Sequence, residues 1–284
     1  MSLQNTIAKL YVRLVFRDDG EFDALKTQRD FNVADPPKKI ADRCVPIDDP
    51  VRAFWIDRKN SSRGVLVYLH GGAFYFGPVK EHWDYFARIC KMSGMAGILV
   101  DYGIAPQDLF PVGLNQIVDL VTTLELPEKW FFLGDSSGAA MAVSACFRLR
   151  EMNAALPNGL VLMSPWIDAT LANPDIKLNE HEDPMMTAKR LLSAAQCYAP
   201  ERDLTNPMIS PMFGDLAGLP PMLVQMGTSD LLLADCRKFV EKCREAGVDV
   251  KYDEVPNAFH DFMMLSFLPE AKRAIRSQVK FLGR

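Results

Sequence analysis

The segment Gly134-Asp135-Ser136-Ser137-Gly138 places a serine between two glycines in the spacing Gly-x-Ser-x-Gly. The apolar run WFFLG, residues 130–134, precedes it, and the helix-like stretch AAMAVSACFRLR follows it. A strand, a sharp turn and a helix in this order make a nucleophile elbow, in which the serine takes strained backbone angles and glycines keep the neighbouring space clear. The pattern predicts Ser136 as a nucleophile. The alternative is a Gly/Ser turn that caps a helix.

A serine hydroxyl needs a base to take its proton before it attacks, so the prediction requires a histidine. The chain has four, at positions 70, 82, 181 and 260. His260 lies in PNAFHDF, a polar loop between the last apolar strand-like run and the last helix-like stretch. The carboxyl ends of parallel strands meet at one edge of a sheet. We therefore expect His260 on the same edge as Ser136.

The third member of such a site is an acid that orients the imidazole and stabilises its charged form. Asp230 follows the apolar run PMLVQMG, and the order Ser136, Asp230, His260 is a Ser-Asp-His order. Asp230 would also suit the N-cap of the next helix. The rival acids are Asp235, ranked second, Glu254 and Asp261; Asp261 is expected to point away from the adjacent histidine.

Acyl transfer also needs hydrogen-bond donors aimed at a developing oxyanion. The segment YLHGGAFYFG, residues 68–77, follows a strand-like run and carries two adjacent glycines. We expect the backbone amides of Gly71 and Gly72 as two donors, and the amide of Ser137, directly after the nucleophile, as the third. His70 is then expected to position this loop, not to act as a base.

Short apolar runs alternate with helix-like stretches along most of the chain, which predicts an α/β fold with a mostly parallel sheet. The strand-like runs are 51–57, 64–69, 96–101, 130–134, 159–164, 221–227 and 249–255. The helix-like stretches are 81–93, 111–125, 137–152, 231–247 and 267–282.

Two regions interrupt the alternation. Residues 1–35 have a helical pattern, and residues 169–219 scatter Pro, Asn and Asp around one helical stretch at 187–198. Neither region has a run typical of a sheet strand. We expect both to pack over one end of the sheet as a cap region, and residues 36–168 and 220–284 to form the catalytic domain.

Composition narrows the classes of partner. A net charge of −4 and a pI near 5.6, with no Lys/Arg run, disfavour nucleic-acid and polybasic membrane binding. No apolar run approaches the ~18 residues that span a bilayer, so no membrane insertion is expected. The six cysteines are dispersed and form no CxxC pair, which is typical of reduced thiols, and a cytoplasmic location is the simplest interpretation.

With these residues together, the sequence resembles the hormone-sensitive-lipase-like branch of the α/β-hydrolase esterases. The family motif His-Gly-Gly-Gly corresponds to residues 70–73, followed by the later glycine Gly77. The motif Gly-Asp-Ser-Ala-Gly-Gly corresponds to residues 134–139, and Tyr-Arg-Leu-Ala-Pro-Glu to residues 102–107. Residues 164–168 and 219–221 are also similar to the family pattern. The resemblance covers residues 50–284.

The resemblance implies an α/β-hydrolase fold with helices on both faces of the sheet and a helical cap. It also implies a serine carboxylesterase that acts on short to medium acyl esters and uses neither a metal nor an organic cofactor. Ala73 and Ala139 replace family glycines, and Gly103 and Gln107 replace an arginine and a carboxylate. Asp261 replaces a glycine and would add a carboxylate near the imidazole.

Several alternatives stay open. The same residues would serve an amidase, a formamidase or a deacetylase of one metabolite, and a non-catalytic small-ligand receptor is a further alternative. His181, in NEHEDP, would suit a metal site, although an exposed loop is favoured. The oligomeric state is open, with a homo-oligomer among the alternatives. The residues expected to line the acyl pocket, each with core packing as its alternative, are Phe74, Phe76, Trp166, Met185, Met186 and Phe262.

Overall fold

The computed structural model describes residues 2–16 and 22–283. In that part of the chain, eight strands form one sheet in the order β1-β2-β4-β3-β5-β6-β7-β8. From β4 and β3 through β8 every neighbouring pair is parallel, and β2 is antiparallel to both β1 and β4. The mostly parallel sheet predicted from the sequence is confirmed. The strands are β1 (Cys44–Ile47), β2 (Ala53–Ile56), β3 (Val65–Leu69), β4 (Ala96–Val100), β5 (Trp130–Asp135), β6 (Leu160–Met163), β7 (Met222–Gly227) and β8 (Val250–Val255).

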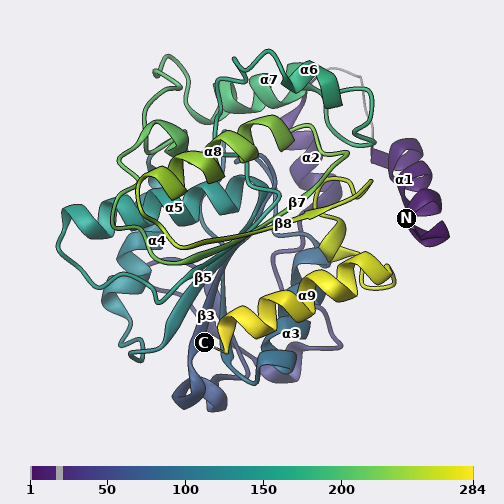
Figure 1. Cartoon of the computed structure of the whole chain (residues 1–284). Helices are drawn as coiled ribbons and strands as arrows, with labels where there is room; N and C mark the ends of the chain where they lie inside the picture. Colours follow the sequence, from purple (N-terminus) through teal and green to yellow (C-terminus); the bar gives the residue numbers. More distant parts are fainter. Residues whose placement is uncertain (1, 17–21, 284) are drawn as a thin grey trace.

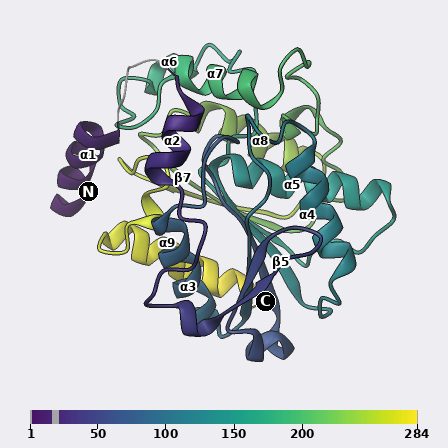
Figure 2. The ribbon, with the colours of Figure 1, turned by 180° about the vertical axis from the view of Figure 1, so that it is seen from behind.

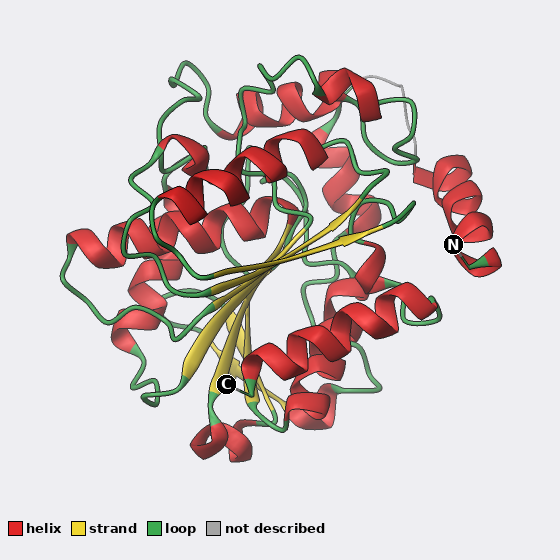
Figure 3. Ribbon diagram, in the orientation of Figure 1, coloured by secondary structure: helices red, strands yellow, loops and turns green. Residues whose placement is uncertain are grey.

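Helices cover both faces of this sheet (Figure 1). On one face lie α4 (Val112–Thr123), α5 (Ser136–Glu151) and α8 (Leu233–Glu245). On the other lie α3 (Lys80–Ser93) and α9 (Pro269–Leu282). Figure 3 shows the twist of the strands between these two layers. The five helices correspond to the five helix-like stretches of the sequence.

The sheet divides the buried apolar residues into two clusters. Along β3, Val65, Val67 and Leu69 belong to the cluster beneath α4, α5 and α8, and Leu66 and Tyr68 belong to the cluster beneath α3 and α9. All five side chains are fully buried. Successive residues of a strand point to opposite faces, so a strand covered on both sides needs apolar residues at every position. This requirement explains the continuous apolar runs.

One strand was not expected from the sequence. β1, with the sequence CVPI, is a half-exposed edge strand that pairs antiparallel with β2. Its proline and its exposed positions leave no continuous apolar run. An edge strand buried on fewer sides carries a weaker pattern, which is why it was missed.

The remaining helices come from the two regions that interrupt the alternation. They are α1 (Leu3–Phe16) and α2 (Ala24–Phe31) near the amino end, and α6 (Ile176–Asn179) and α7 (Ala188–Tyr198) in residues 169–219. Thr187 caps α7, and its side chain accepts a hydrogen bond from the Arg190 amide. Figures 1 and 2 show α2 at the same end of the molecule as α6 and α7. The division into a catalytic domain and a cap stays a prediction.

Two further observations concern the described residues. No helix among the described residues is both long and apolar enough to cross a lipid bilayer. All six cysteines lie in the described part and are free thiols.

Candidate active site

Ser136 lies where β5 ends and α5 begins, with φ of 49° and an exposed fraction of only 5%. This left-handed conformation is strained for a residue with a side chain and is the backbone signature of an elbow. A side chain at Gly138 would overlap the Leu69 carbonyl, and one at Gly134 would overlap the Gly138 backbone. The turn therefore requires both glycines.

Asp230 and His260 form a buried pair. The Nδ1–H group of His260 donates to Oδ2 of Asp230 at 3.0 Å, and the two residues are 4% and 0% exposed. Asp230 follows β7 and His260 follows β8, which are parallel neighbours, so both residues lie at the carboxyl edge of the sheet. The structure thus joins these two predicted residues.

The rival acids lie elsewhere. Asp235, on α8, accepts a hydrogen bond from Asn173 at 2.7 Å, and Glu254 pairs with Arg237 at 2.7 Å. Asp230 is not the N-cap of α8, which is Leu232, but its Oδ1 accepts from the Leu232 amide at 3.0 Å. This bond holds the Asp230 side chain while Oδ2 receives the histidine.

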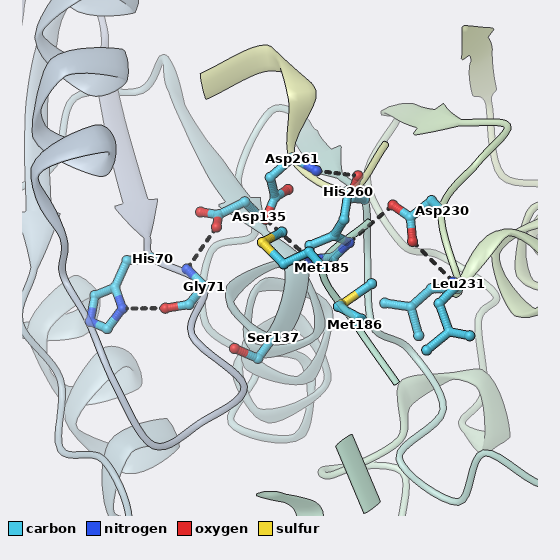
Figure 4. A network of polar contacts seen from close by, with 12 residues as sticks. His70, Gly71, Asp135, Ser137, Met185, Met186, Asp230, Leu231, His260 and Asp261 are labelled. Carbon is cyan, nitrogen blue, oxygen red and sulfur yellow. Dashed lines mark hydrogen bonds and ion pairs between the residues drawn. The ribbon is translucent and has the colours of Figure 1, made fainter. Parts of the chain in front are cut away.

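The orientation expected of Asp261 is wrong. Asp261 has φ of 52°, and its Oδ2 lies 3.2 Å from Nε2 of His260. The left-handed backbone turns its side chain back toward the ring instead of away from it. Within the described residues, no hydrogen bond joins Ser136 to His260. Figure 4 shows Asp230 and Asp261 reaching the imidazole from different directions.

These two carboxylates control the charge on the ring. Burial alone would lower the pKa of His260, but Asp261 and then Asp230 outweigh burial and raise it well above its usual value. Burial, with a smaller contribution from Asp135, raises the pKa of Asp261 to about 6 even though His260 opposes that shift. His260 and Asp261 together therefore retain a proton to higher pH than an exposed histidine would.

In the loop after β3, one of the two expected oxyanion donors already has a hydrogen-bond partner. The Gly71 amide donates to Oδ2 of Asp135 at 3.0 Å, so its N–H group is already engaged (Figure 4). In the described part of the chain, the amides of Gly72 and Ala73 have no hydrogen-bond partner. Gly72 has φ of 118°, and a side chain there would overlap the Phe76 carbonyl.

The third donor expected is the Ser137 amide, in the first turn of α5. The first amides of a helix have no carbonyl partner within it, so this N–H group is directed outward. The Ser137 hydroxyl is used differently, since it accepts a hydrogen bond from the Phe74 amide at 3.3 Å. Ser137 thus links the start of α5 to the glycine loop.

Asp135 anchors the glycine loop from below. Besides the Gly71 amide, it accepts from the Tyr68 hydroxyl at 2.5 Å and lies 3.3 Å from Nε2 of His82. Burial would raise the pKa of this carboxyl, but His82 and Tyr68 together lower it. Because the Val79 amide donates to Nδ1 of His82, the proton on this ring is at Nε2 and faces Asp135.

His70 has the loop-positioning role expected for it. Its Nδ1–H group donates to the Gly71 carbonyl at 2.7 Å, and its ring stacks on Tyr102 at 4.4 Å. The Tyr102 hydroxyl in turn donates to the His70 carbonyl. Burial, followed by His82, lowers the pKa of His70 to about 3, so the ring is neutral. A fully buried neutral imidazole bound to its own loop is not placed to act as the base.

Two positioning residues were missed in the sequence. Asp183 is fully buried, accepts from the amides of Met185 and Met186, and accepts from the Leu231 amide beside Asp230. It ties the 169–219 region to the loop that carries Asp230. Burial and Asp230 raise its pKa to about 6. An aspartate before a proline in a polar segment gave no signal of this role.

Ser164 is the second missed residue. It follows β6, has φ of 42°, and its hydroxyl accepts from the Asp261 amide at 3.1 Å. Two residues later the Trp166 amide donates to the Ser136 carbonyl at 3.0 Å. The turn after β6 therefore connects the serine loop to the histidine loop. The signal available was its position, as the last residue of the strand-like run 159–164.

Two departures from the family pattern have local partners. The side-chain amide of Gln28, on α2, donates to the Tyr75 and Ala105 carbonyls, both at 2.8 Å, and exchanges hydrogen bonds with Gln107. The Gly103 amide donates to Gln116 at 2.6 Å. A pair of neutral amides thus links α2 to the loop after β4.

The six residues expected to line a pocket differ in burial. The Phe74 ring stacks on the Tyr198 ring with 4.3 Å between centroids, and its centroid lies 5.2 Å from that of Trp166. Phe74 and Trp166 are both buried. Met186 is buried, and Phe76 and Met185 are half-buried. Phe262 is 0% exposed and belongs to the cluster beneath α3 and α9, the environment of a core residue. A pocket lined by the other five stays a prediction.

His181 is exposed after α6. Among the residues that the structure describes, no group of three or more His, Cys, Asp or Glu side chains is arranged to hold a metal ion.

Comparisons with known proteins agree with this arrangement. Residues 66–264 match the family model described as the alpha/beta hydrolase fold. An esterase of Acinetobacter venetianus is 32% identical over 238 residues, which cover 81% of this chain and 78% of that protein. An acetyl-hydrolase of Streptomyces hygroscopicus is 30% identical over 235 residues, covering 81% and 79%.

A solved structure extends the similarity to almost the whole chain. The crystal structure of an esterase from the bacterial hormone-sensitive lipase family superimposes with a TM-score of 0.85 at 28% identity, covering 99% of this chain and 96% of that one. The fold, the strained serine turn and these relatives point to one conclusion. The chain belongs to the alpha/beta hydrolase family, among the esterases related to hormone-sensitive lipase.

Proposed function

We propose that the protein is a serine carboxylesterase that hydrolyses short to medium acyl esters through a covalent acyl-enzyme. Its similarity to esterases identifies it as a carboxylic ester hydrolase. The observation that carries the serine mechanism is the buried hydrogen bond between Asp230 and His260 at the sheet edge where Ser136 takes its strained conformation. That edge is where parallel α/β folds bind their ligands.

In this mechanism the Ser136 hydroxyl attacks the ester carbonyl and Nε2 of His260 takes its proton. The tetrahedral intermediate collapses, Nε2 returns the proton to the departing alkoxide, and an alcohol leaves. Water, whose proton the same nitrogen takes, then attacks the acyl-serine; the bond between Ser136 and the acyl group breaks, Nε2 returns the proton to the serine oxygen, and the carboxylic acid leaves. Asp230 accepts a hydrogen bond from the Nδ1–H group and so fixes the tautomer that leaves Nε2 free to accept a proton. None of these steps requires a cofactor.

The oxyanion that forms on the carbonyl needs donors that are not otherwise engaged. We assign this role to the amides of Gly72, Ala73 and Ser137, in place of the engaged Gly71 amide. Ala73 takes φ of 51°, so a small side chain is accommodated in the left-handed region. Asp135 supports the assignment, because its bond to the Gly71 amide holds the loop that carries the next two amides.

The acyl group would lie near Phe74, Phe76, Trp166, Met185 and Met186. The acetyl-hydrolase named among the relatives supports a short acyl group. Asp183 would position the two methionines, since it binds both of their amides. Acyl preference is then set by how this segment packs over the serine.

A series of 4-nitrophenyl esters from acetate to decanoate tests the proposal. We expect the wild type to prefer the shorter members and Ser136→Ala to lose at least about 10⁴-fold in kcat on all of them, because the nucleophile is gone. Ser137→Ala is the matched control, since it keeps its backbone amide and should retain substantial activity. Equal rates for wild type and Ser136→Ala across the series would reject the assignment.

The same series separates the alternatives. The 4-nitroanilide of the preferred acyl group tests amide cleavage, and faster cleavage of the anilide than of the ester would identify an amidase. A protein that binds the esters without turning any of them over would be a receptor.

A further inference from the structure

Both ring nitrogens of His260 face a carboxylate. Nδ1 is 3.0 Å from Asp230, and Nε2, the nitrogen that must accept the serine proton, is 3.2 Å from Oδ2 of Asp261. The mechanism proposed above uses Asp230 and leaves Asp261 without a role. Asp261 also stands where the family pattern has a glycine, which has no carboxylate to make this contact.

The contact requires a proton. A neutral imidazole that donates through Nδ1 presents a lone pair at Nε2, which an ionised carboxylate at 3.2 Å would repel. Either Nε2 carries a hydrogen and donates it to Asp261, or Asp261 is protonated and donates to Nε2. The two arrangements contain the same number of protons, and in both Nε2 is unable to accept a proton from Ser136.

The backbone holds Asp261 in this place. Its φ of 52° lies in the left-handed region, which aspartate and asparagine tolerate better than most residues. Its amide donates to Ser164, and the next residue, Phe262, is fully buried. The second carboxylate oxygen, Oδ1, is buried and has no hydrogen-bond partner among the described residues. His260 is therefore the contact that stabilises the carboxylate charge.

The charged groups around this contact are mostly acidic. Asp230 faces the other side of the ring, and Asp183 and Asp135 act on the pair through space. His82, bound to Asp135, is an imidazole on which Asp261 also acts through space. The surplus of carboxylates favours retention of a proton at His260.

We propose that Asp261 is a positioning residue that holds His260 in a proton-bearing resting state, turned to Asp261 instead of Ser136, and so sets the pH at which hydrolysis begins. This inference rests on the proposed serine mechanism. As the pH rises, the shared proton leaves to solvent, Asp261 turns from Nε2, and the free lone pair accepts the Ser136 proton. No bond in the ester changes until that proton has left.

The test is the pH profile of kcat/KM with the best ester of the series. Asp261→Asn removes the charge and keeps the tolerance for a left-handed backbone, and Asp261→Gly removes the side chain in a residue that adopts this conformation freely. We expect the acid limb of both variants to move to lower pH by about one to three units, the usual effect of removing an opposite charge within hydrogen-bond distance. Activity below neutral pH should rise accordingly.

Asp235→Asn is the matched control. Asp235 is also buried, with a pKa raised by burial to about 6, but it pairs with Asn173 instead of His260. Its variant should leave the acid limb in place. An unmoved limb in both Asp261 variants, with Ser136-dependent activity intact, would overturn the inference and leave the serine mechanism standing. Loss of Ser136 dependence would instead reject the proposed function.

Discussion

Ser136, Asp230 and His260 come from three turns that the sequence keeps far apart. Each turn directly follows a parallel strand, and the backbone of each turn aims one side chain. The left-handed φ of Ser136 orients its side chain, and the hydrogen bond from the Leu232 amide orients that of Asp230. The chemistry proposed for the site depends on these local geometries as much as on residue type.

Asp230→Asn tests the acid at this scale. An asparagine would present an N–H group to Nδ1 or lose the charge that stabilises the imidazolium, so we expect kcat to fall by about 10⁴-fold with KM little changed. Asp235→Asn should retain wild-type kcat, since Asp235 pairs with Asn173. The measurement is steady-state hydrolysis of the preferred 4-nitrophenyl ester. A larger loss in the Asp235 variant than in the Asp230 variant would move the acid to α8.

Residue types and chain order were sufficient to predict the Asp230 and His260 pair. They were not sufficient for Gly71 or Asp261. Whether a backbone amide has a hydrogen-bond partner depends on the direction of its N–H group. Asp135 binds the Gly71 amide because β5, which ends at Asp135, and β3, which Gly71 closely follows, lie side by side. The Asp261 side chain depends on one φ angle, which the sequence does not specify.

At the scale of elements, the end of β5 both positions the serine and holds the glycine loop. Ser136 begins α5, and Asp135, one residue earlier, holds the Gly71 amide, the Tyr68 hydroxyl and His82. The carboxylate joins β3, β5 and α3 below the glycine loop. Its removal would leave three buried donors without an acceptor.

Asp135→Asn therefore tests how the loop is anchored. Removing one partner of a buried charged pair is strongly destabilising, and we expect the free energy of unfolding to fall by about 3 kcal/mol at neutral pH. The pKa of Asp135 is lowered in the folded protein, so its contribution is complete above its unfolded pKa and is lost as the pH falls through the folded value. The difference between the two proteins should therefore persist down to about pH 4, near the unfolded pKa, and close only as the pH falls further, through the folded value.

Urea unfolding across this pH range measures the difference. The control is Asp101→Asn, at the end of β4, where a partly exposed pair with Arg52 should contribute under about 1 kcal/mol. A difference between wild type and Asp135→Asn that stays constant down to acid pH would show that the charge on Asp135 is not what anchors the loop.

Long apolar elements were predictable because burial on both faces imposes a continuous pattern. β3 through β7 are buried at every position and follow that pattern, and the five helices that cover the sheet match the helix-like stretches of the sequence. β1 and α6 are short and partly exposed, so packing does not constrain their composition and the sequence carries little signal for them. Weak signals thus belong to the elements with the least burial.

At the scale of the whole molecule, a parallel sheet collects the chemistry at one edge. The loops after β3, β5, β6, β7 and β8 meet there, and contacts such as Trp166 to Ser136 and Asp261 to Ser164 link them. α2, α6 and α7, from the two regions that interrupt the alternation, lie at the same end of the molecule (Figure 2). The meeting of the loops at one edge of the sheet follows from the parallel strands and was accessible from the alternation of elements alone.

The contacts that join the 169–219 region and α2 to the loops of the site could not be predicted from the alternation of elements. Asp183 reaches the loop of Asp230, and Gln28 reaches the loops after β3 and β4, through irregular segments whose course no periodic pattern describes. These contacts decide how the 169–219 region and α2 sit on the site. Acyl preference, which depends on them, is therefore a matter for the ester series.

The central claim is that Ser136 is a nucleophile activated by His260, and covalent labelling tests it most directly. The intact protein, treated with a 4-nitrophenyl alkylphosphonate, should gain the mass of one adduct, mapped by peptide mass spectrometry to Ser136. Ser136→Ala should stay unlabelled, and Ser137→Ala should label like the wild type. An unlabelled wild type, or an adduct on Ser137 or another residue, would contradict the account.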